Sequence, residues 1–137
     1  MKLLRLELYE KYYSFLIILL IAFLDWALKL YFYYQDNYYI NPGIFFGTAK
    51  SHIMVGFLLS LIGITSWLVF FLWKIRQASK AIFFGSCLIL YGGMSNFCDR
   101  LIFQGVIDYI HFGQISIFNL ADILICLGII ILIFSKR

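Results

Sequence analysis

Charged residues are scarce in this chain of 137 residues. Asp, Glu, Lys and Arg together make up 13% of it, whereas a soluble domain contains about 25%. Hydrophobic residues make up 64%, which is typical of a membrane protein and excludes an ordinary soluble domain. The net charge of +4 therefore does not indicate a nucleic-acid partner, and the positions of the charges matter more than their sum.

Proline, histidine and cysteine are also rare. The single proline, Pro42, lies in INPGIFFG, where Asn-Pro-Gly is typical of a turn. The two histidines, His52 and His111, are isolated from other metal ligands. The cysteines lie in or at the ends of apolar runs without metal-ligand spacing: Cys87, Cys98 and Cys126. We therefore expect no metal site and no cofactor.

Long apolar runs occur four times, and each approaches or exceeds the roughly 20 residues that cross a bilayer as a helix. They cover residues 12–34, 53–73, 80–98 and 115–134. The sequence therefore predicts an all-α membrane protein, a single polytopic domain over residues 1–137 with four transmembrane helices. Between these runs, DNYYI and GVIDYI are candidates for short β segments in the outer loops.

Basic residues gather before the first predicted helix, between the second and third, and at the end of the chain: Lys2, Arg5, Lys11, Lys74, Arg76, Lys80, Lys136 and Arg137. Loops rich in Lys and Arg stay in the cytoplasm, so both termini are predicted to be cytoplasmic and loops 35–52 and 99–114 to face outward. A signal peptide is the alternative for the N-terminus. We expect a retained helix instead, because no cleavage site follows and the apolar run continues to Tyr34.

Polar residues of the predicted helices collect at one depth. At about 1.5 Å per residue, Asp25 and Lys29 lie in the outer half of the first helix, and Asp122 lies near the outer end of the fourth. The other polar residues expected at this level are Asn41, Asn96, Asp99, Arg100, Asn119 and, if its loop folds back, Asp108. Ionisable residues inside a membrane usually face the bundle interior and mark function, so we interpret this zone as a site.

The spacing of these residues brings three sets onto shared helix faces: Asp25 with Lys29, Asn96 with Asp99 and Arg100, and Asn119 with Asp122. Purely structural pairing is the alternative, and it is strongest for Asp25 with Lys29, which can neutralise each other. Arg100 either pairs with Asp99 or extends to the membrane surface. The two asparagines can hold helices together as well as bind substrate.

Paired aspartates offer a definite chemistry. Two carboxylates held close together share a proton, so one can take a proton from water while the other protonates a carbonyl or a leaving amine. That is peptide hydrolysis without a metal or a covalent intermediate. From charge and depth alone, Asp99 and Asp108 are equal candidates to pair with Asp122. A serine nucleophile is not supported, because Ser95 and Ser116 lack an adjacent histidine and no motif assigns Lys29 as a base.

Five motifs in order resemble those of the bacterial lipoprotein signal peptidases, also called signal peptidase II. They are DWALK at 25–29, NPGIFFG at 41–47, SNFCDR at 95–100, GVIDY at 105–109 and FNLAD at 118–122. The resemblance implies an aspartic endopeptidase of the bacterial cytoplasmic membrane, monomeric and surrounded by membrane lipids, with its active site near the outer leaflet. Its substrates would be prolipoproteins, cut just before the diacylglyceryl-modified cysteine.

The same resemblance implies roles for individual residues. Asp108 and Asp122 match the catalytic aspartates of the family, and this match is what favours Asp108 over Asp99. The positions that match substrate-binding or supporting residues are Asp25, Lys29, Asn41, Gly43, Asn96, Asp99, Arg100 and Asn119.

Three residues depart from the family pattern: Trp26 replaces a glutamine, Phe45 an alanine and Ser95 a glycine. The intervals from Asp25 to Asn41 and from Asp108 to Asp122 are also shorter than in the family. Two alternatives to the peptidase follow: a small ion- or proton-conducting membrane protein, or a catalytically silent relative that binds lipidated peptides. A conducting relay needs polar groups across the whole bilayer, and the inner halves of the predicted helices carry almost none.

Overall fold

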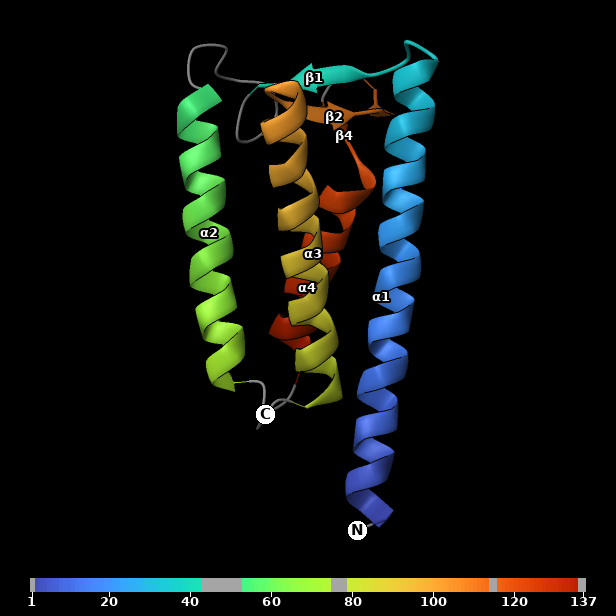
Figure 1. Cartoon of the computed structure of the whole chain (residues 1–137), viewed down its shortest axis with the longest axis vertical. Helices are drawn as coiled ribbons and strands as arrows, with labels where there is room; N and C mark the ends of the chain where they lie inside the picture. Colours follow the sequence, from blue (N-terminus) through green and yellow to red (C-terminus); the bar gives the residue numbers. More distant parts are fainter. Residues whose placement is uncertain (1, 43–52, 75–78, 114–115, 136–137) are drawn as a thin grey trace.

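A computed structural model describes residues 2–42, 53–74, 79–113 and 116–135. Four helices run side by side, and small strands gather at one end of the bundle (Figure 1). The helices are α1 (Lys2–Tyr34), α2 (Ile53–Lys74), α3 (Lys80–Phe103) and α4 (Leu120–Phe134), and the strands are β1 (Tyr39–Asn41), β2 (Val106–Asp108), β3 (Ile110–Phe112) and β4 (Ser116–Phe118). The short β segments predicted in the outer loops are therefore present.

Among the described residues, three helices are long and apolar enough to cross a membrane: Tyr12–Tyr34, Gly56–Trp73 and Lys80–Phe103. Helix α4 is apolar but has only 15 residues. A helix of that length rises about 22 Å, less than the hydrocarbon core of about 30 Å. A fourth crossing and cytoplasmic termini therefore stay predictions.

Three predicted helix boundaries differ from the structure. The third helix continues from 98 to Phe103, because Leu101, Ile102 and Phe103 extend the turn until Gln104 adopts a left-handed conformation with φ 59°. The fourth helix begins at Leu120 rather than at 115, because Ser116–Phe118 pairs with β3 as a strand and Asn119 caps the helix. The first helix also begins ten residues before its predicted apolar run, at Lys2.

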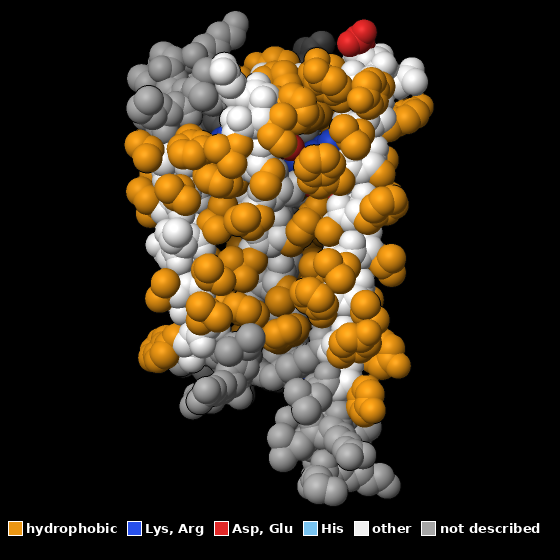
Figure 2. Space-filling view, in the orientation of Figure 1, with side chains coloured by type: hydrophobic (Ala, Val, Ile, Leu, Met, Phe, Trp, Pro, Cys, Tyr) orange, Lys and Arg blue, Asp and Glu red, His pale blue; other side chains and the backbone are white. Residues whose placement is uncertain are grey.

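Helix α3 is central, and it packs most closely on α4. The approach depends on glycine: a Cβ added at Gly92 would lie 2.5 Å from the Ala121 carbonyl oxygen, and one added at Gly128 would lie 2.6 Å from the Gly85 carbonyl oxygen. Such small-residue contacts let two helix backbones approach within a membrane. Away from these contacts the surface is densely apolar (Figure 2), as expected of side chains that face lipid.

The strands form two antiparallel pairs at one end of the bundle. Strand β1 pairs with β2 so that Tyr39 lies opposite Asp108, and β3 pairs with β4 as a hairpin. All three residues of β2 are buried. The first pairing joins segments 67 residues apart and brings Asn41 and Asp108 to the same place.

Candidate active site

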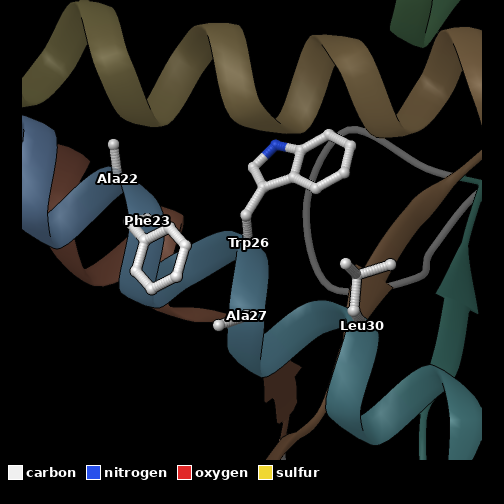
Figure 3. Close-up of a pocket in the computed structure, with 5 residues that line it drawn as sticks. All are labelled: Ala22, Phe23, Trp26, Ala27 and Leu30. Carbon is white, nitrogen blue, oxygen red and sulfur yellow. The ribbon is translucent and has the colours of Figure 1, made fainter.

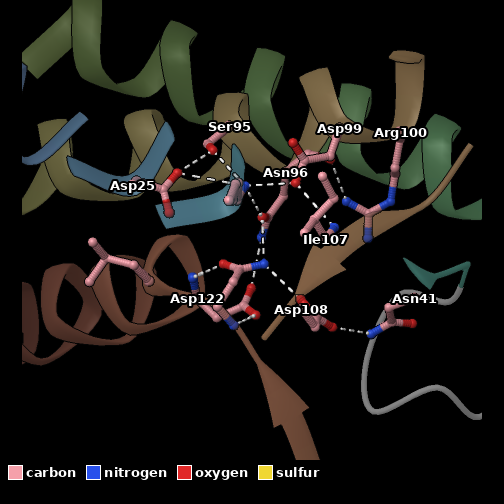
Figure 4. A network of polar contacts seen from close by, with 12 residues as sticks. Asp25, Asn41, Ser95, Asn96, Asp99, Arg100, Ile107, Asp108 and Asp122 are labelled. Atoms are coloured by element: carbon pink, nitrogen blue, oxygen red, sulfur yellow. Dashed lines mark hydrogen bonds and ion pairs between the residues drawn. The ribbon is translucent and has the colours of Figure 1, made fainter. Parts of the chain in front are cut away.

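Asp108 is the last residue of β2, and its side chain is 1% exposed. Each carboxylate oxygen accepts a hydrogen bond from an asparagine amide. Asn41 Nδ2 donates to Oδ2 at 2.9 Å, and Asn119 Nδ2 donates to Oδ1 at 2.7 Å. The buried carboxyl is therefore satisfied by neutral donors from two different segments of the chain (Figure 4).

Asp122 lies in the first turn of α4, where Asn119 is the N-cap. The Asn119 side-chain oxygen accepts from the Asp122 backbone N–H at 3.1 Å, and the Asn119 backbone N–H donates to Asp122 Oδ2 at 3.3 Å. This reciprocal capping box fixes the carboxylate at the positive end of the helix dipole. Asn96 Nδ2 from α3 donates to its other oxygen at 2.7 Å.

Asn119 therefore connects the two candidate catalytic aspartates. Its side-chain amide donates to Asp108, while its backbone and its side-chain oxygen hold Asp122. The same amide also donates to Asn96 Oδ1 at 3.1 Å, so the site is tied to α3. Asp108 and Asp122 thus share one cap residue although they come from a strand and a helix.

The environment of Asp108 favours its protonated form. The pKa of Asp108 is raised from its ordinary 3.8 to about 7, chiefly by burial and also by the charge of Asp122. The hydrogen bonds from Asn41 and Asn119 and the charge of Lys29 lower this pKa. Burial is the largest effect, so the pair can hold one proton near neutral pH, as an acid–base dyad requires.

Lys29 is the centre of a second network, and it is 2% exposed. Its Nζ lies 2.7 Å from Asp99 Oδ2 and 3.6 Å from Asp25 Oδ2. It also donates to Asn96 Oδ1 at 3.3 Å, which links it to the dyad through Asn96. Asp25 and Lys29 do form an ion pair on one helix, and Lys29 forms a shorter one with Asp99 on α3.

Asp99 lies in this second network rather than in the dyad. Besides Lys29, its Oδ2 accepts from the backbone N–H of Ile107 at 3.2 Å. Ile107 immediately precedes Asp108, so Asp99 anchors the strand that carries the candidate catalytic carboxyl. Arg100 is half-buried and donates through Nη1 to the Asn96 carbonyl oxygen at 3.1 Å, one turn back on α3.

Ser95 and Tyr91 also contact Asp25, and neither was predicted to do so. Ser95 Oγ donates to Asp25 Oδ2 at 2.6 Å, and Tyr91 Oη donates to the same oxygen at 3.1 Å. The spacing in the sequence could have indicated these contacts, because positions 91, 95 and 99 are four residues apart and lie on one face of a helix. The contacts of Ser95 do not support a serine nucleophile. Its hydroxyl donates a hydrogen bond to Asp25, and its oxygen accepts one from Lys29 Nζ at 2.7 Å.

Gly43, the remaining predicted site residue, lies outside the described residues, as does His52. Within the four described ranges, no group of three or more His, Cys, Asp and Glu side chains is arranged to hold a metal ion.

Trp26 lies apart from the polar site although it follows Asp25 directly. It is 43% exposed and lines an apolar hollow on α1 with Ala22, Phe23, Ala27 and Leu30. Figure 3 shows its indole extending from α1 toward α3. The residue that departs from the family pattern therefore lies on a partly exposed apolar surface, while Asp25 and Lys29 contact α3.

Comparisons with known proteins agree on one family. The family described as signal peptidase (SPase) II matches residues 17–136. A curated relative, the lipoprotein signal peptidase of Bartonella bacilliformis, is 39% identical over 102 residues, which are 70% of this chain and 61% of the relative. The chain thus spans about three fifths of that relative's length.

Two solved structures of bacterial membrane enzymes, both obtained by the in meso method, share the fold. The first has a TM-score of 0.73 at 22% identity, and the aligned region covers 88% of this chain and 84% of that structure's chain. The second has a TM-score of 0.67 at 21% identity, and the aligned region covers 88% of this chain and 89% of that structure's chain.

Proposed function

The chain belongs to the signal peptidase II family, and from that premise we propose that it is an aspartic endopeptidase acting on diacylglyceryl-modified prolipoproteins. It removes the signal peptide by cutting before the lipidated cysteine. The observation that carries the proposal is the shared cap: Asn119 binds both Asp108 and Asp122, in a place where burial keeps a proton on the pair.

The chemistry follows from one proton held between two carboxylates. Asp108, with its raised pKa, supports the role of the acid that donates to the scissile carbonyl oxygen, and Asp122 then takes a proton from the attacking water. Water adds to the carbonyl carbon to give a tetrahedral diol. When the diol collapses, the C–N bond breaks and the proton held by Asp122 passes to the leaving amine, while Asp108 recovers its own.

The substrate class fits the position of the dyad. A lipid-modified cysteine holds the scissile bond at the membrane surface, and the dyad lies beside the strands at one end of the bundle. With the basic loops in the cytoplasm, that end faces the outer leaflet of the bacterial cytoplasmic membrane. A conducting relay is less well supported, since the buried ionisable residues Asp25, Lys29, Asp99 and Asp108 belong to this end and do not continue along the bundle.

The test is cleavage of a diacylglyceryl-modified precursor by the full chain in liposomes. We expect Asp108→Asn and Asp122→Asn each to lower kcat by about 10³-fold, because each removes one half of the acid–base pair. Asp36→Asn is the matched control, because Asp36 is an exposed aspartate outside the site. Full activity in both dyad variants would refute the assignment. Tight binding without cleavage by the unaltered chain would support the silent relative instead.

A further inference from the structure

Tyr109 follows Asp108 directly and is buried, yet the chemistry above gives it no role. Its backbone N–H donates to the Phe118 carbonyl oxygen at 3.1 Å, and its hydroxyl accepts from the Leu120 backbone N–H at 3.3 Å. Phe118 and Leu120 are the two neighbours of Asn119. Tyr109 therefore binds the chain on both sides of the residue that joins the two aspartates.

The Leu120 contact has a physical reason. Leu120 is the first residue of α4, and the first N–H groups of a helix have no partner within the helix. Asn119 satisfies the N–H of Asp122, and the Tyr109 hydroxyl satisfies that of Leu120. The two residues together cap α4, and one of them is attached to the strand that ends in Asp108.

The ring of Tyr109 is held in place from a third element. It stacks on Phe32 of α1, with ring centroids 4.6 Å apart and planes 10° from parallel. Parallel stacking restricts where the hydroxyl can lie. The hydroxyl thus reaches α4 from a rigid support formed by α1 and β2.

We propose that Tyr109 is a positioning residue for the dyad, whose hydroxyl sets the distance between the Asp108 and Asp122 carboxylates by fixing the first turn of α4 against β2. This inference rests on the proposed peptidase function for its catalytic consequence. Asp108 and Asp122 lie on separate elements, and Asn119 hydrogen-bonds both of them. The Tyr109 contacts on either side of Asn119 add a second connection between β2 and the first turn of α4.

Tyr109→Phe tests the proposal, because it removes the hydroxyl and keeps the ring against Phe32. We expect kcat for the lipidated precursor to fall about tenfold, the upper end of what one neutral hydrogen bond contributes, with KM changed less than twofold. Tyr34→Phe, which removes a hydroxyl from a side chain that is 80% exposed, is the matched control and leaves kcat unchanged.

A second measurement does not depend on cleavage. In the unaltered protein, we expect the carboxyl carbon of Asp108, followed by NMR in detergent micelles, to titrate with a pKa raised to about 7 by burial. In Tyr109→Phe, the looser first turn of α4 admits water and moves Asp122 away from Asp108. Both changes favour the ionised form of Asp108, so the midpoint of its titration falls. An unchanged kcat or an unchanged midpoint would overturn the positioning role. If the unaltered chain does not cleave, the proposed function fails, and the midpoint alone decides the role of Tyr109.

Discussion

Asparagine amides donate hydrogen bonds to both candidate catalytic carboxylates. Asn41 and Asn119 donate to Asp108, and Asn96 donates to Asp122. A neutral amide stabilises a carboxylate less than a cation does, so the pair can keep a shared proton. The buried cation Lys29 forms its closest ion pair with Asp99, and it also donates to Asn96, whose amide donates to Asp122.

The Asn41 contact predicts a shift in the pH dependence of cleavage. Its hydrogen bond favours the ionised form of Asp108, so Asn41→Ala raises the pKa of Asp108 above about 7. If protonated Asp108 is the acid, activity then persists to higher pH, and the alkaline limb of kcat/KM moves up by about 0.5 to 1 pH unit. Asn37→Ala, at an exposed asparagine, should leave the limb in place. A downward shift in Asn41→Ala would contradict the assignment of Asp108 as the acid.

Ser95 predicts an effect on stability. Asp25 is fully buried, and Ser95→Ala removes its closest donor, at 2.6 Å, together with an acceptor of Lys29. We expect the free energy of unfolding to fall by about 1 to 3 kcal/mol, the cost of leaving a buried polar group unsatisfied. Thermal unfolding in detergent measures the change. Ser60→Ala, whose hydroxyl bonds only within its own helix at Gly56, is the control, and an equal loss in both variants would refute the role of Ser95.

At the scale of elements, the sequence located the helices better than their ends. Apolar runs mark segments that avoid water, but they do not distinguish a strand from a helix when the strand is as apolar as Ser116–Phe118. The Asn119 and Asp122 spacing did predict a shared face, because a capping box is local. The pairing of Asn41 with Asp108 could not be predicted from spacing, since it crosses 67 residues and depends on the β1–β2 register.

The contact between α3 and α4 predicts that Gly92 supports the site as well as the fold. A Cβ at Gly92 would lie 2.5 Å from the carbonyl oxygen of Ala121, the residue before Asp122. Gly92→Ala therefore pushes the first turn of α4 away from α3, and we expect a loss of stability of about 1 to 3 kcal/mol together with lower kcat. Gly63→Ala on α2 is the control, because its Cβ would meet no atom within 4 Å. Equal stability of the two variants by thermal unfolding would contradict this packing role.

In the part of the chain that the structure describes, an apolar outer surface is combined with buried charged side chains that gather at one end. Exposed leucine, isoleucine, phenylalanine and tyrosine side chains cover the helices, whereas Asp25, Lys29, Asn96, Asp99 and Asn119 are buried near the strands. Burying ions in a membrane is costly unless they are paired, and the Lys29 network supplies the pairing. One end of the molecule, the polar end, therefore holds the buried charges. The orientation of the protein in the membrane decides on which side the two candidate catalytic aspartates lie.

The basic loops predict that orientation, and labelling of introduced cysteines measures it. His111 is exposed on β3 at the polar end, and Ser79 is exposed before α3 at the other end. Because Lys and Arg favour the cytoplasm, a membrane-impermeant maleimide should label His111→Cys in intact cells and Ser79→Cys only after the cells are opened. The unaltered chain, with Cys87, Cys98 and Cys126, gives the background. The reverse pattern would turn the dyad toward the cytoplasm, where a precursor anchored in the outer leaflet could not reach it.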